Sequence, residues 1–151
     1  MRLDQKGNKS LIKALIDTNI LVSGLFAETG RIAELMNLWV NGGFELVTSE
    51  EILDELYRVF HKPSIQKHFN PSEEEIMEYL TIIKERALTT YNLYQTDKIK
   101  KDPSDNKFLS CALEARADFI VSGDKHLTEV KNFYGIKIVG VKPFLETIKR
   151  Q

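Results

Sequence analysis

The sequence predicts an α/β fold built on a largely parallel sheet. Short apolar runs, each about the length of a buried strand, alternate with longer segments whose apolar residues recur at helical spacing. Strands separated by helices are joined by right-handed crossovers, which makes neighbouring strands parallel. We expect a single domain over residues 12–151, preceded by a loosely ordered polar segment at residues 1–11.

The first part of the chain predicts two strands with a helix between them. An apolar run that ends at Asp17 predicts a buried strand followed by a turn. Helical spacing over residues 32–39 predicts a helix that stops at Gly42 and Gly43, because glycine suits a left-handed cap. Residues 44–47 then predict the second strand.

Two further helices are expected next. Thr48 with Glu51 three residues later is a capping-box pattern, which predicts a helix that ends near Phe60. Residues 62–71 form a polar connector with two prolines, and apolar spacing over residues 76–87 predicts a long amphipathic helix.

The second half of the chain continues the alternation of strands and helices. Its expected elements are, in order, a strand at 89–94, a charged loop at 98–105, a helix to about 117, strands at 119–122 and 136–139, and a short helix at 143–150.

Composition and charge limit the classes of function. With 21 Lys and Arg against 22 Asp and Glu, the net charge of -1 excludes nucleic-acid binding through a globally positive surface. The single cysteine, Cys111, excludes an internal disulfide and a cysteine zinc site, and fits a reducing compartment. We expect a cytoplasmic protein with no membrane contact, because no secretory signal or membrane-length apolar run is present.

Acidic residues directly follow two of the expected strands. Asp17 follows the first strand, and Asp124 follows the strand at 119–122 after one glycine. Ligands of open parallel sheets bind beyond the carboxyl ends of the strands, so both acids are candidates for a site. The alternative for each is a helix-cap or turn residue.

Glu55 lies on the apolar stripe of its expected helix, between Ile52 and Val59. A carboxylate turned toward the sheet is costly unless a cation, a basic group or hydrogen bonds compensate it. The alternative is that Glu55 lies at the edge of the stripe and pairs with Arg58 in solvent.

The segment from Asp102 to Asp105 opens another helix. Asp102 before Pro103 is a good cap arrangement, whereas Asp105 is in line with Phe108 on the buried face. The alternative role of Asp105 is to complement the helix dipole.

Asp17, Glu55, Asp105 and Asp124 are expected to converge at the carboxyl edge of the sheet, with no Lys or Arg assigned between them. Such a cluster repels itself, and Mg²⁺ or Mn²⁺ relieves the repulsion with the oxygen ligands that these ions prefer. One or two such ions activate water and neutralise a phosphodiester, so the cluster indicates phosphodiester hydrolysis.

Three segments in this order resemble PIN-domain nucleases, in particular toxins of toxin-antitoxin systems. They read ALIDTNILVSG, TSEEILDELYRVF and DPSDNKFLSCALEARADFIVSGDKHL, and the similarity extends over residues 13–144. The ordered set is far more specific than any one motif.

The resemblance implies a three-layer α/β/α sandwich, Mg²⁺- or Mn²⁺-dependent endonucleolytic cleavage of single-stranded RNA, a homodimer and an antitoxin partner. Its four acids fall on Asp17, Glu55, Asp105 and Asp124, although Asp102 also fits the third position. By analogy, Asn19 accompanies the first acid, and Asn106 and Ser122 hydrogen-bond ligands or metal-bound water.

Other functions fit less well. Phosphatases with an aspartate nucleophile need a second acid where Asn19 stands, and response-regulator receivers share only the Lys142-Pro143-Phe144 pattern. The remaining alternative is a PIN-like module that binds RNA or protein without cutting, which the intact acids disfavour. Lysines that would contact phosphates, or simply form a solvated surface, are Lys98, Lys100, Lys101, Lys107 and Lys125.

Overall fold

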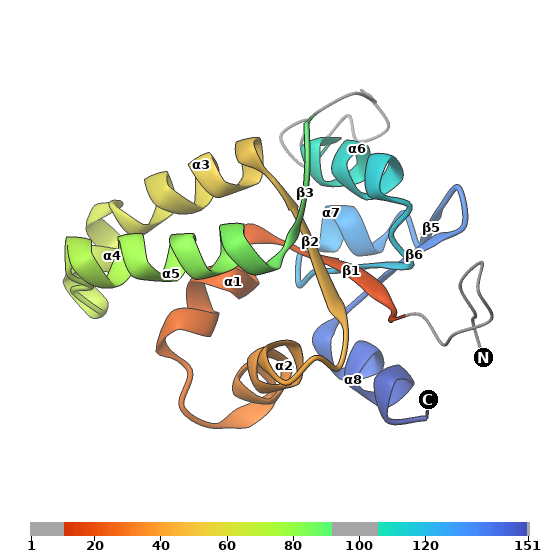
Figure 1. Cartoon of the computed structure of the whole chain (residues 1–151), viewed down its shortest axis with the longest axis horizontal. Coiled ribbons are helices and arrows are strands. Elements are labelled where there is room, and N and C mark those ends of the chain that lie inside the picture. Colours follow the sequence, from red (N-terminus) through yellow and green to blue (C-terminus); the bar gives the residue numbers. More distant parts are fainter. Residues whose placement is uncertain (1–10, 92–105, 151) are drawn as a thin grey trace.

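The computed structural model describes residues 11–91 and 106–150, and this part of the chain contains a six-stranded sheet covered by helices on both faces (Figure 1). The strand order is β3-β2-β1-β4-β6-β5, in which only the β5–β6 pair is antiparallel. The expected mostly parallel sheet is thereby confirmed. The strands are β1 (Lys13–Ile16), β2 (Glu45–Ser49), β3 (Leu88–Thr90), β4 (Phe119–Val121), β5 (Asn132–Phe133) and β6 (Ile136–Val139).

The helices form the two outer layers of an α/β/α sandwich. On one face, residues of α1, α2, α3, α5 and α8 pack against Ala14 and Ile16 of β1, and on the other face α6 and α7 pack against Leu15. This alternation follows from the two-residue period of a strand. The helices are α1 (Thr18–Phe26), α2 (Gly30–Val40), α3 (Glu50–Phe60), α4 (Pro63–His68), α5 (Glu73–Arg86), α6 (Asn106–Ala115), α7 (Lys125–Thr128) and α8 (Val141–Lys149).

The strand order reverses between β1 and β4. The chain proceeds from β1 to β2 and β3 on one side, and then returns to place β4 and β6 on the other. Crevices at such a reversal are where open α/β sheets bind ligands. The residues that follow β1 and β4 therefore lie at the favoured position for a site.

Two expectations about the first half of the chain are wrong. A helix, α1, follows β1 where a turn was expected, because Asp17 caps it and residues 20–22 are buried against the core. The cap of α3 is Ser49, whose Oγ accepts the Ile52 N–H at 3.1 Å, and not Thr48, which belongs to β2. Of the two glycines expected to suit the left-handed cap, Gly42 adopts that conformation, with φ at +80°, and Gly43 does not.

Short elements account for the other differences. The polar connector contains α4, which Pro63 opens, and α5 begins at a capping box between Ser72 and Glu75. Neither α7 nor β5 was expected, because an element of two to four residues has no detectable period.

The strand expected at residues 89–94 is β3, which ends at Thr90, and residues 92–94 lie outside the described part of the chain. The later elements are close to their expected bounds. β6 has the expected bounds, and α8 begins two residues before the expected helix. The segment at residues 1–10 and the charged loop at 98–105 lie outside the described residues. Among the residues that the structure describes, no helix combines the length and apolar character that crossing a membrane requires.

Candidate active site

Asp17 lies between β1 and α1 with only 4% of its surface exposed. Its backbone N–H donates to the carbonyl of Val121 at 3.1 Å, which ties the ends of β1 and β4 together. One side-chain oxygen, Oδ1, accepts the Ile20 N–H at 3.1 Å. The acid is thus held in place by the sheet and by the first turn of α1.

Ser122 joins the two acids that follow β1 and β4. Its buried hydroxyl donates to Asp17 Oδ2 and accepts the backbone N–H of Asp124 at 2.9 Å. By analogy with PIN-domain nucleases, Ser122 was expected to hydrogen-bond ligands or metal-bound water. In the structure its proton is directed to Asp17, so it orients that carboxylate.

Asp124 caps the short helix α7. Its Oδ1 accepts the His126 N–H at 2.7 Å, while 29% of its side chain stays exposed. Asp17 and Asp124 therefore both cap helices and both lie at the carboxyl ends of adjacent strands. The cap interpretation and the site interpretation are compatible for both residues.

The electrostatics of Asp17 are unfavourable for a negative charge. Burial is the main cause that raises its pKa, the charge of Asp124 raises it further, and the hydrogen bonds from Ser122 and Ile20 lower it. Within the described residues, no Lys, Arg or His forms an ion pair with Asp17. A bound cation would remove this electrostatic cost.

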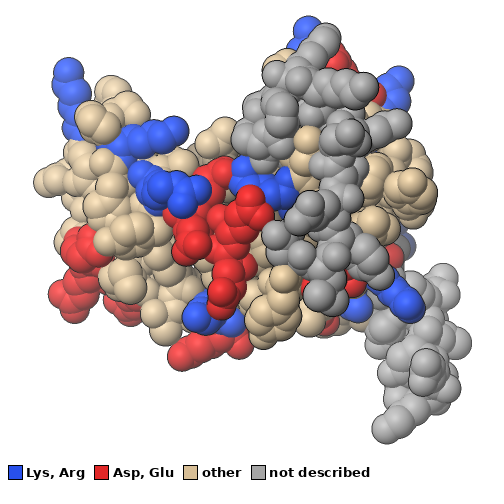
Figure 2. All heavy atoms as spheres, turned by 90° about the horizontal axis from the view of Figure 1, so that it is seen from above, with Lys and Arg blue, Asp and Glu red and all other residues tan. Residues whose placement is uncertain are grey.

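Glu55 is compensated by a lysine. Lys107, in the first turn of α6, places its Nζ on Glu55 Oε2, and Arg58 does not take part in this ion pair. No Lys or Arg was assigned to the acids from the sequence, and of the possible ways to compensate Glu55 the structure shows a basic group. Figure 2, which looks down on the end where α3 and α6 lie, shows basic side chains against acidic ones in the middle of that face.

Two of the other predicted residues lie within the described part of the chain. Asn19 is exposed on α1, and Asn106 is the first residue of α6. Asp102 and Asp105 lie outside the described residues. In the two described ranges, no three Asp, Glu, His or Cys side chains lie close enough to hold a metal ion together. The structure joins Asp17, Ser122 and Asp124, and gives Glu55 a separate partner.

The donors around Asp17 suit a divalent cation. The hydroxyl of Thr18, the residue after Asp17, is buried and has no hydrogen-bond partner in the described part of the chain. Sequence analysis missed Thr18, since its only signal is its place next to Asp17. Two carboxylates and an unsatisfied hydroxyl are all oxygen donors, which Mg²⁺ and Mn²⁺ prefer.

The chain is similar to known proteins in sequence and in fold. The chain is 27% identical over 154 residues to an uncharacterized protein, MJ1680, of Methanocaldococcus jannaschii, and the alignment covers 97% of each protein. The crystal structure of PAE2754 from Pyrobaculum aerophilum superposes with a TM-score of 0.61 at 12% identity, over 93% of this chain and 91% of that one.

A family model described as the PIN domain matches residues 13–126, a range that contains Asp17, Glu55 and Asp124. PIN domains have a nuclease fold and are generally metal-dependent ribonucleases. Because the match covers well over half of the sequence, the chain belongs to the PIN domain family.

Proposed function

We propose that the protein is an Mg²⁺- or Mn²⁺-dependent endoribonuclease that hydrolyses phosphodiester bonds of single-stranded RNA. The observation that carries this proposal is the buried Asp17, which Ser122 links to Asp124 where the strand order reverses. Burying a carboxylate without a basic partner is costly, and a divalent cation would remove that cost.

Each residue of the proposed site has a distinct role. Asp17 and Asp124 hold the cation, Ser122 orients Asp17, and Glu55 and Asp105 complete the acidic set that the sequence predicts. Supporting positions are Asn19, Asn106 and Asp102, of which Asp102 remains an alternative to Asp105. When bound, the cation activates a water molecule and neutralises charge on the phosphodiester.

Lys125 supplies a positive charge beside the acids. It follows Asp124 directly, and 84% of its side chain is exposed, so its ammonium group is accessible to a phosphate of the RNA. Its side chain also lies 3.9 Å from Glu129, an exposed pair of little energetic weight.

The biological setting follows from the motif resemblance. We propose a toxin of a toxin-antitoxin system, located in the cytoplasm, that forms a homodimer and is bound by an antitoxin protein. We also propose that residues 12–151 fold as one domain. The net charge of -1 limits contact with RNA to local, exposed basic side chains such as that of Lys125.

The test compares wild type with Asp17→Asn on a labelled single-stranded RNA, with Mn²⁺, with Mg²⁺ and with EDTA. We expect metal-dependent internal fragments from the wild type, and a loss of about 10²-fold or more in the variant. Asp54→Asn, the same change at an exposed position of α3, is the matched control and should cleave like the wild type. Equal cleavage by Asp17→Asn would refute the proposed role.

A non-catalytic PIN-like module that binds RNA or protein is the second candidate. The observation in its favour is the Glu55–Lys107 ion pair, which leaves one fewer acid free for a cation. This candidate predicts RNA or protein binding that EDTA leaves unchanged, and no cleavage by any variant. The same assay, run with a gel-shift measurement, separates the two candidates.

A further inference from the structure

We propose that Lys107 takes the place of a cation at Glu55, so that the divalent cation is held by Asp17 and Asp124 without Glu55. This inference rests on the proposed function and concerns which of the predicted acids bind the cation. Lys107 is then a positioning residue, which acts through the carboxylate that it binds.

The burial of Lys107 separates it from the other lysines in ion pairs. Its side chain is 8% exposed, whereas those of Lys84 and Lys125 are 65% and 84% exposed. An exposed pair contributes little, because water screens it. A buried ammonium group, by contrast, is retained only where a carboxylate compensates it.

Two elements fix this ammonium group. Lys107 lies in the first turn of α6, and its Nζ is 4.7 Å from the centre of the Phe108 ring. Glu55 comes from α3 and is 25% exposed. The pair therefore joins two helices that are far apart in the sequence, and neither charge can move into water without breaking this contact.

The two acids consequently differ in what they offer a metal ion. Glu55 already has a positive partner, so a cation must displace Lys107 before it binds there. Asp17 has no such partner within the described residues, and Asp124 adds a second negative charge beside it. Binding of a divalent cation is therefore more favourable at Asp17 than at Glu55.

The experiment titrates Mn²⁺ alone into the purified full chain by calorimetry. The proteins are wild type, Glu55→Gln, Lys107→Met, Lys107→Arg, the Glu55→Gln/Lys107→Met double variant and Asp17→Asn. Met keeps the apolar stem against Phe108, and Arg keeps the charge. Denaturation midpoints in EDTA check that each variant is folded.

We expect Glu55→Gln and Lys107→Arg to bind Mn²⁺ within about twofold of the wild type, and Lys107→Met to bind more tightly by about tenfold or to bind an additional ion. The gain should vanish in the double variant, because it depends on the carboxylate of Glu55. Asp17→Asn should lose Mn²⁺ binding.

Two results would overturn the inference. One is a loss of about tenfold in Mn²⁺ affinity in Glu55→Gln, which would make Glu55 a ligand in spite of Lys107. The other is a folded Lys107→Met protein whose Mn²⁺ binding is unchanged. If Lys107→Met does not fold, the Mn²⁺ affinities of Glu55→Gln and Lys107→Arg decide the outcome. The double variant, which carries neither charge, then serves as their reference.

The inference and the proposed function fail in different ways. If the Mn²⁺ affinities follow the expected pattern but no protein cleaves RNA, the proposed nuclease activity is refuted and the proposed role of Lys107 stands. If the wild type cleaves RNA only with metal and Glu55→Gln binds Mn²⁺ more weakly, the nuclease activity stands and the proposed role of Lys107 is refuted. No Mn²⁺ binding by any of the proteins would refute both.

Discussion

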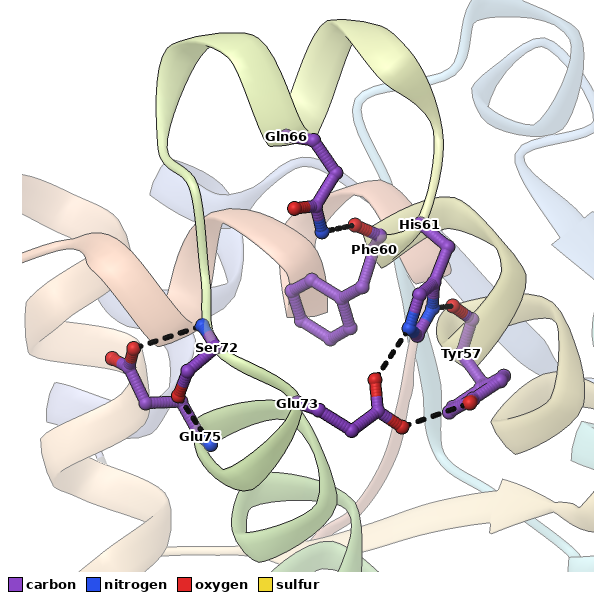
Figure 3. Close-up of polar contacts among 7 residues, drawn as sticks. All are labelled: Tyr57, Phe60, His61, Gln66, Ser72, Glu73 and Glu75. Atoms are coloured by element: carbon purple, nitrogen blue, oxygen red, sulfur yellow. Dashed lines mark hydrogen bonds and ion pairs between the residues drawn. The ribbon is translucent and has the colours of Figure 1, made fainter.

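Two groups of polar side chains in the described part of the chain each place a hydroxyl on a carboxylate, and they shift the pKa of that carboxylate in opposite directions. In the inner cluster, the Ser122 hydroxyl donates to buried Asp17, beside Asp124. In the outer cluster, the Tyr57 hydroxyl donates to exposed Glu73 at 2.9 Å, and His61 Nε2 lies 2.6 Å from the same carboxylate (Figure 3).

The pKa shifts of the two carboxylates have opposite signs. The hydrogen bond from His61 is the main cause that lowers the pKa of Glu73, while burial is the main cause that raises the pKa of Asp17. Each carboxylate accepts a hydroxyl hydrogen bond, so the hydroxyl alone does not set the sign. Loss of water and the presence of a cationic partner decide it.

The positions of the two clusters indicate different roles. The outer cluster joins the end of α3 to the first residue of α5, beside a cavity of about 690 Å³ between these helices. Its side chains are hydrogen-bonded to one another across the two helices, so the outer cluster connects α3 to α5. The inner cluster lies where the strand order reverses and contains a buried acid that has no basic partner among the described residues, which is the arrangement that a cation would complete.

The largest expected effect on stability is at Ser122. Ser122→Ala removes the donor to Asp17 and the acceptor for the Asp124 N–H, which should destabilise the metal-free protein by about 1–3 kcal/mol. The measurement is urea unfolding in EDTA.

Thr48→Val is the matched control for that variant. It removes a buried hydroxyl that has no partner among the described residues, so we expect no loss of stability. If Ser122→Ala were as stable as Thr48→Val, the hydroxyl bridge would contribute nothing to the inner cluster.

A smaller effect is expected for Asp17→Asn in EDTA. The pKa of Asp17 is raised on folding from its ordinary value of 3.8, so its contribution to stability is present at lower pH and is lost as pH rises through the folded pKa. At neutral pH the variant should be at least as stable as the wild type, and more stable by up to about 1 kcal/mol.

The measurement for Asp17→Asn is thermal unfolding of both proteins from about pH 4 to pH 8, the range over which a raised carboxyl pKa takes effect. The advantage of the variant should grow as pH rises. A clear loss of stability at neutral pH would instead mean that capping of α1 is the main role of Asp17.

The smallest effect is expected in the outer cluster. The carbonyl of Tyr57, followed by Glu73, raises the pKa of His61 above 6.5, so its contribution is lost as pH rises through the folded pKa. The pKa of Glu73 is lowered from 4.5, so its contribution is lost as pH falls through the folded value. Between pH 4.5 and pH 6.5, the ordinary pKa values of Glu and His, both residues make their full contribution to stability.

His61→Gln should therefore lower the unfolding temperature slightly, and most strongly between pH 4.5 and 6.5. Glu74→Gln, an exposed neighbour on the same helix, is the control and should show no such window. An effect of His61→Gln that is independent of pH would mean that the ion pair is not what joins the helices.

Much of the inner cluster could be predicted from the sequence. Asp17 and Asp124 follow apolar runs that are buried on both faces, and a parallel sheet brings the ends of such strands together at one edge. The outer cluster could not be predicted in this way, because His61 and Glu73 flank α4, a short helix that no period reveals. Its pairing depends on how α3 and α5 pack.

The sequence by itself determined the alternation of strands and helices, the parallel sheet and the two acids at its carboxyl edge, because these depend on local period and on connection rules. Only the tertiary structure decided that Ser122 bridges Asp17 and Asp124, and that Lys107 lies buried on Glu55. These contacts join residues far apart in the chain, and their energies depend on burial, which no local pattern of residues specifies.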